Sequence, residues 1–114
     1  MPSTSPLGEF EVVVLMAVLH LSQAGDDAFG SAIRDDIERR SGRQVSRGSI
    51  YITLDRLEEK GLLTSRSGGT SADRGGRPKR LFRVTPPGRR AVKHSLTLFA
   101  RMRAGLEPVL GDLP

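Results

Sequence analysis

Basic side chains gather in one glycine-rich stretch of the sequence, residues 66–80. Arginine and lysine bind phosphate oxygens, and arginine on a glycine-rich loop suits a minor groove or a phosphate clamp. The other interpretation is a solvated hairpin whose charges only keep the protein in solution. The cations of this stretch are Arg66, Arg74, Arg77, Lys79 and Arg80. Taken alone, they indicate either a polyanion contact or a solubilising loop.

Catalytic combinations of side chains are much harder to find. The two histidines, His20 and His94, fall in different expected helices, with no carboxylate at a metal-ligand spacing. The absence of cysteine excludes disulfides, thiolate metal sites and cysteine nucleophiles. The acidic pairs Asp26–Asp27 and Asp35–Asp36 are interpreted as a helix cap and a solvated helix face. We therefore expect no enzyme activity, no metal and no cofactor.

Residues 46–60 carry a second set of candidate contacts on one face of an expected helix. At about 100° per residue, Ile50, Leu54 and Leu57 fall on one side, which predicts that this side is buried. The opposite side is left for a polyanion. Its candidates are Arg47, Gly48, Ser49, Ile52 and Arg56, with Tyr51 at the flank.

Three of these residues have both a functional and a purely structural interpretation. An exposed Ile52 suits the methyl group of a thymine, although single exposed apolar residues are common. Gly48 lets a phosphate approach the backbone, or it serves tight packing or is simply tolerated at a helix start. Tyr51 directs its hydroxyl to a phosphate above a packed ring, or it is a half-buried core residue.

Positive charge is confined to the middle of the chain. Residues 1–42 hold three basic and seven acidic residues, residues 43–90 hold twelve and four, and residues 91–114 hold three and two. A basic middle on a near-neutral frame is typical of a polyanion-binding surface, although composition leaves a solvated basic surface equally open. No apolar run approaches the roughly 18 residues of a membrane span, so we expect a cytoplasmic protein without membrane contact.

The elements that position these candidates are three helices, a hairpin and a further helix. Apolar periodicity and glycine punctuation predict helices over residues 7–23, from Asp26 or Asp27 to about residue 41, and over 46–60. Two strands, 62–66 and 79–85, flank the glycine-rich loop. Thr85 caps the last helix, with Pro86 at its first position. This order predicts a mainly α fold with a small β-hairpin: a winged helix-turn-helix.

The first expected helix is apolar on every side, which a chain of this size has little core to bury. We therefore expect it to contact a second subunit together with the apolar face of the last helix. The expected contacts are Phe10, Val14, Val18, Leu96, Phe99 and Met102. The predicted divisions are a disordered tail over 1–6, the winged domain over 7–85, a dimerisation helix over 86–107 and a tail over 108–114.

Four segments together resemble the PadR family of bacterial regulators over roughly residues 7–92. The most specific are GSIYITLDRLEEKGLL (48–63) and RGGRPKRLFRVTPPG (74–88), which resemble its third helix and its wing. Residues 7–21 and 28–38 resemble its first two helices. Ile52 departs from the pattern, because many members have proline after the tyrosine, and this leaves the groove contact at that position open.

This resemblance implies a homodimeric repressor that binds a palindromic operator in double-stranded DNA. It implies dimerisation through the first and C-terminal helices, and DNA contacts from Gly48, Ser49 and Tyr51. On the wing it implies contacts from Arg77, Lys79 and Arg80. Some relatives are released by phenolic ligands, but with 4% aromatic residues no aromatic cage is visible here.

The leading hypothesis is therefore sequence-specific repression, with release by an unidentified small-molecule effector left open. The alternative is a winged-helix adaptor that binds protein and has no specific DNA site, since a fold does not fix a function. The basic middle segment separates the two, because an adaptor has no need of arginine on its wing. A small hydrolase or metalloenzyme is the most distant hypothesis.

Overall fold

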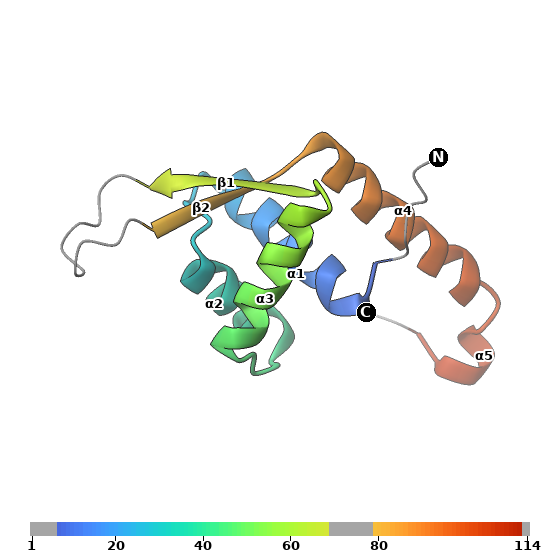
Figure 1. Cartoon of the computed structure of the whole chain (residues 1–114). Coiled ribbons are helices and arrows are strands. Elements are labelled where there is room, and N and C mark those ends of the chain that lie inside the picture. Colours follow the sequence, from blue (N-terminus) through green and yellow to red (C-terminus); the bar gives the residue numbers. More distant parts are fainter. Residues whose placement is uncertain (1–6, 69–78, 113–114) are drawn as a thin grey trace.

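The computed structural model describes residues 7–68 and 79–112 (Figure 1). The predicted tail over 1–6, residues 113–114, and the wing cations Arg74 and Arg77 lie outside these residues. The elements, in chain order, are α1 (Glu9–Gln23), α2 (Gly30–Ser41), α3 (Arg47–Glu59), β1 (Leu63–Gly68), β2 (Lys79–Val84), α4 (Pro86–Arg103) and α5 (Glu107–Leu110).

Local capping fixes the start of α3 and of α4. Ser46 precedes α3 and its hydroxyl accepts a hydrogen bond from the Ser49 N–H at 3.1 Å. Thr85 does the same for the Gly88 N–H, also at 3.1 Å, and Pro86 opens α4. Each cap satisfies a backbone donor that the first helical turn leaves free. Both N-caps predicted from the sequence are confirmed.

The start of α2 differs from the prediction. Neither Asp26 nor Asp27 caps it: the N-cap is Phe29, which has no side-chain capping bond. Phe29 instead forms an isolated antiparallel bridge with Leu81, and the Phe82 N–H donates to the Ala28 carbonyl at 3.0 Å. The chain before α2 is therefore held by the hairpin, which overrides the local capping preference of the aspartates.

The hairpin follows the alternation of the sequence. Strands β1 and β2 pair antiparallel from Leu63 opposite Val84 to Gly68 opposite Lys79. Phe82 and Val84 are buried and Arg83 is exposed, as the period of two requires. The register places the side chains of the wing on two defined faces.

Helix α1 lies at the centre of the core rather than at its edge. Val14, Leu15 and Val18 are completely buried, and the remaining apolar residues of α1 are buried or half-buried. Contacts come from α2, α3, α4 and β2, which together surround the helix. The core side of α1 is thus buried within the subunit, whereas Val13, Met16 and Leu19 stay half-buried. The expected contact of α1 with a second subunit stays a prediction.

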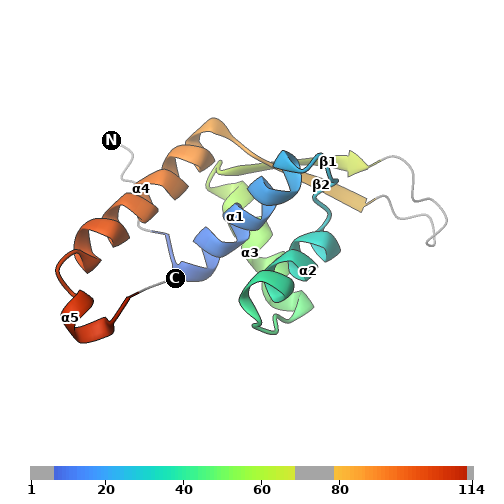
Figure 2. The same cartoon turned by 180° about the vertical axis from the view of Figure 1, so that it is seen from behind.

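The C-terminal helix is shorter than predicted. Helix α4 ends at Arg103, Ala104 leaves the helical region with φ −58° and ψ 130°, and Gly105 has φ +88°. Residues Glu107–Leu110 then form the separate short helix α5, where a tail was expected. Figures 1 and 2 show α4 running away from the body, so that α5 and the strands β1 and β2 lie on opposite sides of the molecule.

A charged contact joins α1 to the end of α3. The Lys60 ammonium donates to both carboxylate oxygens of Glu11, at 2.8 and 3.0 Å, and the Gly8 N–H donates to one of them at 3.0 Å. Burial by itself raises the pKa of Glu11, but these hydrogen bonds and the positive charges of Lys60 and Arg56 outweigh it and lower the pKa below its ordinary value of 4.5.

The Glu11–Lys60 pair makes a contribution to the free energy of unfolding that is lost in acid. Because the folded-state pKa of Glu11 is the lower one, its contribution is complete above pH 4.5 and is lost as the pH falls through the folded value. We expect Glu11→Gln to cost about 1 kcal/mol at neutral pH and to flatten the loss of stability below pH 4.5. Urea unfolding at pH 7 and pH 3.5 measures both effects. If the free energy of unfolding falls between pH 7 and pH 3.5 by the same amount in Glu11→Gln as in the parent, this assignment is refuted.

Candidate nucleic-acid interface

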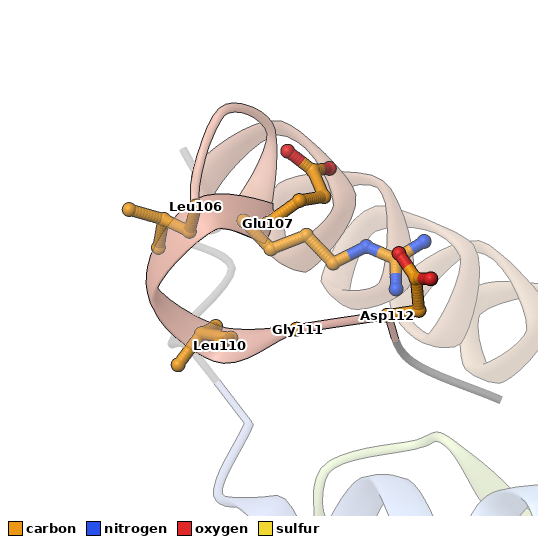
Figure 3. Close-up of a pocket in the computed structure, with 6 residues that line it drawn as sticks. Leu106, Glu107, Leu110, Gly111 and Asp112 are labelled. Carbon is orange, nitrogen blue, oxygen red and sulfur yellow. The ribbon is translucent and has the colours of Figure 1, made fainter.

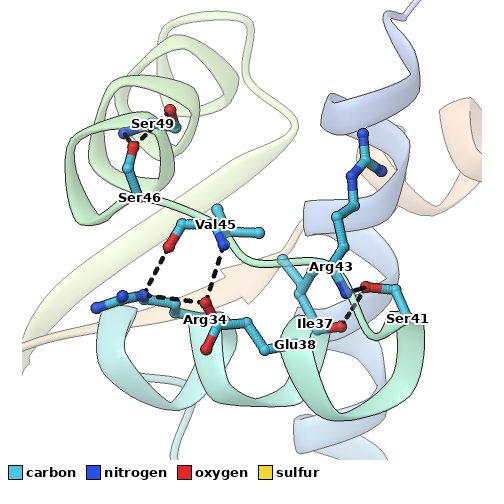
Figure 4. A network of polar contacts seen from close by, with 8 residues as sticks. All are labelled: Arg34, Ile37, Glu38, Ser41, Arg43, Val45, Ser46 and Ser49. Atoms are coloured by element: carbon cyan, nitrogen blue, oxygen red, sulfur yellow. Dashed lines mark hydrogen bonds and ion pairs between the residues drawn. The ribbon is translucent and has the colours of Figure 1, made fainter.

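The link between α2 and α3 is held by a two-sided contact from α2. The Arg34 Nε donates to the Val45 carbonyl at 2.8 Å, and the Val45 N–H donates to the Glu38 carboxylate at 2.9 Å (Figure 4). Arg34 and Glu38 are also paired with each other at 3.6 Å. Both polar groups of one link residue are therefore satisfied by a single helix turn, which fixes where α3 begins.

Helix α3 presents the face that the sequence predicts. Its opposite side, including Ile50, Leu54 and Leu57, is fully buried. Ile52 is 60% exposed, which leaves its side chain available to a ligand. The other exposed candidates on this face are Arg47, Gly48, Ser49 and Arg56.

Tyr51 lies at the flank of this face and is half-buried. A Cβ on Gly30 would lie 2.4 Å from the Tyr51 hydroxyl oxygen and 2.5 Å from its Cζ, so the phenol ring lies directly on the first turn of α2. Gly30 is therefore a residue that positions Tyr51. In the sequence, its only signal is a glycine at the start of a helix.

Gly48 stands in open space. A Cβ built on it would meet no heavy atom within 4 Å among the described residues. Tight packing within this part of the subunit is therefore not the reason for a glycine here. Tolerance at a helix start and close approach of a ligand remain as the interpretations.

Lys79 and Arg80, neighbouring wing cations at the start of β2, differ in their surroundings. Lys79 is half-buried, and its Nζ lies 5.0 Å from the centroid of the Phe29 ring. Arg80 pairs with Asp55 and Glu58 of α3 and lies over the Phe82 ring. The two neighbours point to opposite faces of β2, so the wing does not present them together.

One acidic residue was misassigned from the sequence. Asp36 belongs to the predicted solvated face of α2, yet it is only 2% exposed. Its carboxylate accepts from Arg39 at 2.7 Å and from Arg40 at 3.0 Å. Arginines three and four positions later on a helix are the signal that could have identified it.

Exposed apolar side chains gather on the outer half of α4. The stripe that buries Val92 against the body continues beyond the body, where Phe99 is 50% and Met102 is 68% exposed. Leu96, Leu98 and Leu106 are exposed beside them. Val14 and Val18, assigned from the sequence to the same subunit contact, are fully buried in this subunit's core, so that assignment was wrong for both. Phe10 is half-buried.

Two of the shallow cavities in the described part of the chain lie outside the α3 face. One, of about 300 Å³, is formed where α4 turns into α5 and is lined by Arg103, Leu106, Glu107, Leu110, Gly111 and Asp112 (Figure 3). The other, of about 340 Å³, lies between the loop after α1 and the hairpin.

Within the described residues, no three His, Asp or Glu side chains come together as metal ligands. No helix there is long and apolar enough to span a membrane.

The fold and this face define a winged helix-turn-helix protein. A model of the transcriptional regulator PadR-like family matches residues 18–94. The chain therefore belongs to the PadR family, and it is a transcriptional regulator of the DNA-binding class. It is 36% identical over 85 residues to the transcriptional regulator Rv3488 of Mycobacterium tuberculosis, which covers 74% of each chain.

Solved structures support the same fold. A PadR family transcription regulator from Clostridium difficile superposes with a TM-score of 0.73 at 19% identity, covering 91% of this chain and all of that one. A PadR-like transcriptional regulator from Bacillus cereus gives a TM-score of 0.66 at 18% identity, covering 90% of this chain and 94% of that one. At these identities the likeness concerns the fold alone.

Proposed function

We propose that this chain is a homodimeric repressor that inserts α3, its recognition helix, into the major groove of a palindromic operator. The observation that carries the proposal is the exposed face of α3, where Ile52 is 60% exposed between Ser49 and Arg56, and the neighbouring Asp55 is paired with Arg80. The DNA contacts of α3, to base edges or to phosphates, come from Arg47, Gly48, Ser49, Tyr51, Ile52 and Arg56. Arg74, Arg77 and Lys79 contact phosphates or the minor groove from the wing.

The second half of the proposal is the subunit contact. Leu96, Phe99 and Met102 on α4 form an apolar face that the subunit leaves exposed. Burying them against a second copy would remove this surface from water, which favours association. Two recognition helices about 34 Å apart would then enter successive major grooves on one side of the duplex. Repression follows by exclusion of RNA polymerase from the occupied operator.

A fluorescence-anisotropy titration tests the DNA half. The probe is labelled DNA from just upstream of the gene itself, with scrambled DNA as competitor at two salt concentrations. We expect tight binding that resists the competitor and weakens steeply with salt, because two subunits displace counterions from many phosphates. Equal affinity for both DNAs, lost at the higher salt, would indicate a basic surface without an operator in that region.

Gly48→Ala separates the two remaining interpretations of this glycine. Because the added methyl meets nothing within 4 Å, we expect helix α3 to become more stable by up to about 1 kcal/mol. If a phosphate approaches the backbone here, operator affinity nevertheless falls about tenfold, or about 1.4 kcal/mol. Thermal unfolding and the anisotropy assay measure the two effects.

Thr97→Ala is the matched control for this variant. Thr97 is an exposed residue of α4, remote from α3, and the change to alanine also favours a helix. We expect it to leave operator affinity unchanged. An unchanged affinity of the Gly48→Ala variant as well would mean that this glycine is only tolerated.

The proposal includes release of the repressor by a small-molecule effector. The cavity of about 300 Å³ at the α4–α5 corner lies beside the exposed Leu106 and Leu110, so a ligand there would act on the apolar end of the subunit. A set of phenolic acids at millimolar concentration, added to the protein–operator complex, tests this part. Undiminished anisotropy with all of them would remove that class of effector.

A further inference from the structure

Arg80 lies on the face of β2 that is turned toward the recognition helix. Side chains two apart on a strand share a face, so Arg80 is on the side of the buried Phe82 and Val84. Its guanidinium carbon lies 4.8 Å from the centroid of the Phe82 ring. Lys79 and Arg83 are on the other face. The register thus directs Arg80 inward, toward α3.

The guanidinium of Arg80 is occupied by two carboxylates of α3. Its Nη1 donates to Asp55 at 3.0 Å, and its Nη2 donates to Glu58. The second oxygen of Glu58 accepts from the Ser65 hydroxyl of β1 at 2.8 Å. One arginine therefore ties together the recognition helix and both strands of the wing.

On a DNA-binding surface, the negative charges of Asp55 and Glu58 are unfavourable unless a cation pairs with them. Asp55 is one helix turn beyond Tyr51 and Ile52, and its side chain is 62% exposed. Unpaired carboxylates at this position would repel phosphates and lower operator affinity. Pairing with the single positive charge of Arg80 halves the net negative charge of this carboxylate pair, which weakens the repulsion, and it holds the wing in a fixed orientation to the helix.

We propose that Arg80 is a positioning residue, which fixes the wing against the recognition helix and partly offsets the negative charge of Asp55 and Glu58 without contacting DNA itself. This inference rests on the proposed function and changes the role that the sequence indicated for Arg80. The wing cations then have two roles: Arg80 binds the carboxylates of α3, and others such as Lys79 contact DNA.

A double-mutant cycle tests the proposal. Arg80→Gln is measured in the parent protein and in the Asp55→Asn/Glu58→Gln background, with Lys79→Gln in both as the matched control. We expect Arg80→Gln to lower operator affinity about tenfold in the parent and less than about twofold in the neutral background. Lys79→Gln is expected to cost the same in both, because its interaction with DNA does not pass through these carboxylates.

The salt dependence of operator affinity is a second measurement, which separates a positioning residue from a residue that contacts phosphate. In the neutral background, we expect Arg80→Gln to leave the slope of log affinity against log salt unchanged. Lys79→Gln should reduce the slope by about one for each phosphate that the lysine neutralises in the parent complex. Equal costs of Arg80→Gln in both backgrounds, with a reduced slope, would overturn the proposal and make Arg80 a DNA contact.

Thermal unfolding of the same variants reports the clamp independently of DNA. We expect Arg80→Gln to lower the melting temperature more in the parent protein than in the neutral background. If Arg80→Gln does not fold, Arg80→Lys takes its place, because lysine keeps the charge but lacks the fork that reaches both carboxylates. A parent protein that folds but binds no operator would contradict the proposed function, whereas an additive stability cycle contradicts the clamp alone.

Discussion

Phe99→Glu is expected to convert the proposed dimer into a folded monomer and to reduce operator affinity by about two orders of magnitude. The side chain is 50% exposed in the isolated subunit, so a glutamate there costs the subunit little. At a subunit contact, two symmetry-related carboxylates would have to lose water together without partners. Affinity then falls because each half-site is bound by a separate subunit.

Sedimentation velocity measures the association state and anisotropy measures the affinity. Thr97→Glu is the matched control, since it places the same charge on an exposed residue two positions away on another side of α4. We expect this control to remain dimeric. A Phe99→Glu variant that also stays dimeric would move the subunit contact away from the outer half of α4.

The largest effect on folding is expected from Gly88→Ala. A Cβ at this position would lie 2.2 Å from the Leu62 carbonyl oxygen and 2.7 Å from Val84 Cγ1. Backbone cannot move aside as a flexible side chain can, so the first turn of α4 must shift away from the turn before β1. We expect a cost of about 3 kcal/mol, equivalent to a melting temperature lower by about 10 to 20 °C.

The surrounding hydrogen bonds make the position sensitive. The Thr85 N–H donates to the same Leu62 carbonyl at 3.1 Å, and the Thr85 hydroxyl donates to the Gly61 carbonyl at 2.8 Å. A shift of α4 therefore strains the cap as well as the packing. Gly48→Ala is the control, because it is the same chemical change in open space. A melting temperature of Gly88→Ala within about 2 °C of the parent would show that α4 is not docked tightly here.

Local features could be predicted because they depend on neighbours in the sequence. The N-caps at Ser46 and Thr85 satisfy donors three residues away, and Gly42 takes the left-handed φ of +71° that ends α2. The alternation through Phe82, Arg83 and Val84 follows from the geometry of a single strand. The exposed side of α3 follows from the helical repeat in the same way.

The failures share a different cause. Whether Val14 and Val18 face a partner subunit or the subunit's own core depends on which elements surround α1, and no pattern within α1 contains that information. The start of α2 was displaced from the aspartates by the bridge between Phe29 and Leu81, which are far apart in the chain. Long-range pairing outweighed a cap worth about 1 kcal/mol.

The sequence by itself thus determined the order of elements as far as α4, most of their boundaries and the exposed face of α3, because caps, periods and positive-φ glycines act over a few residues. Only the tertiary structure decided the roles of identical residue types. Among the described residues Gly48 stands free while Gly88 lies against a carbonyl, and Arg80 is bound by carboxylates while Lys79 lies over the Phe29 ring. The physical reason is that steric contact and ion pairing depend on distances in space, which residues distant in the chain set together.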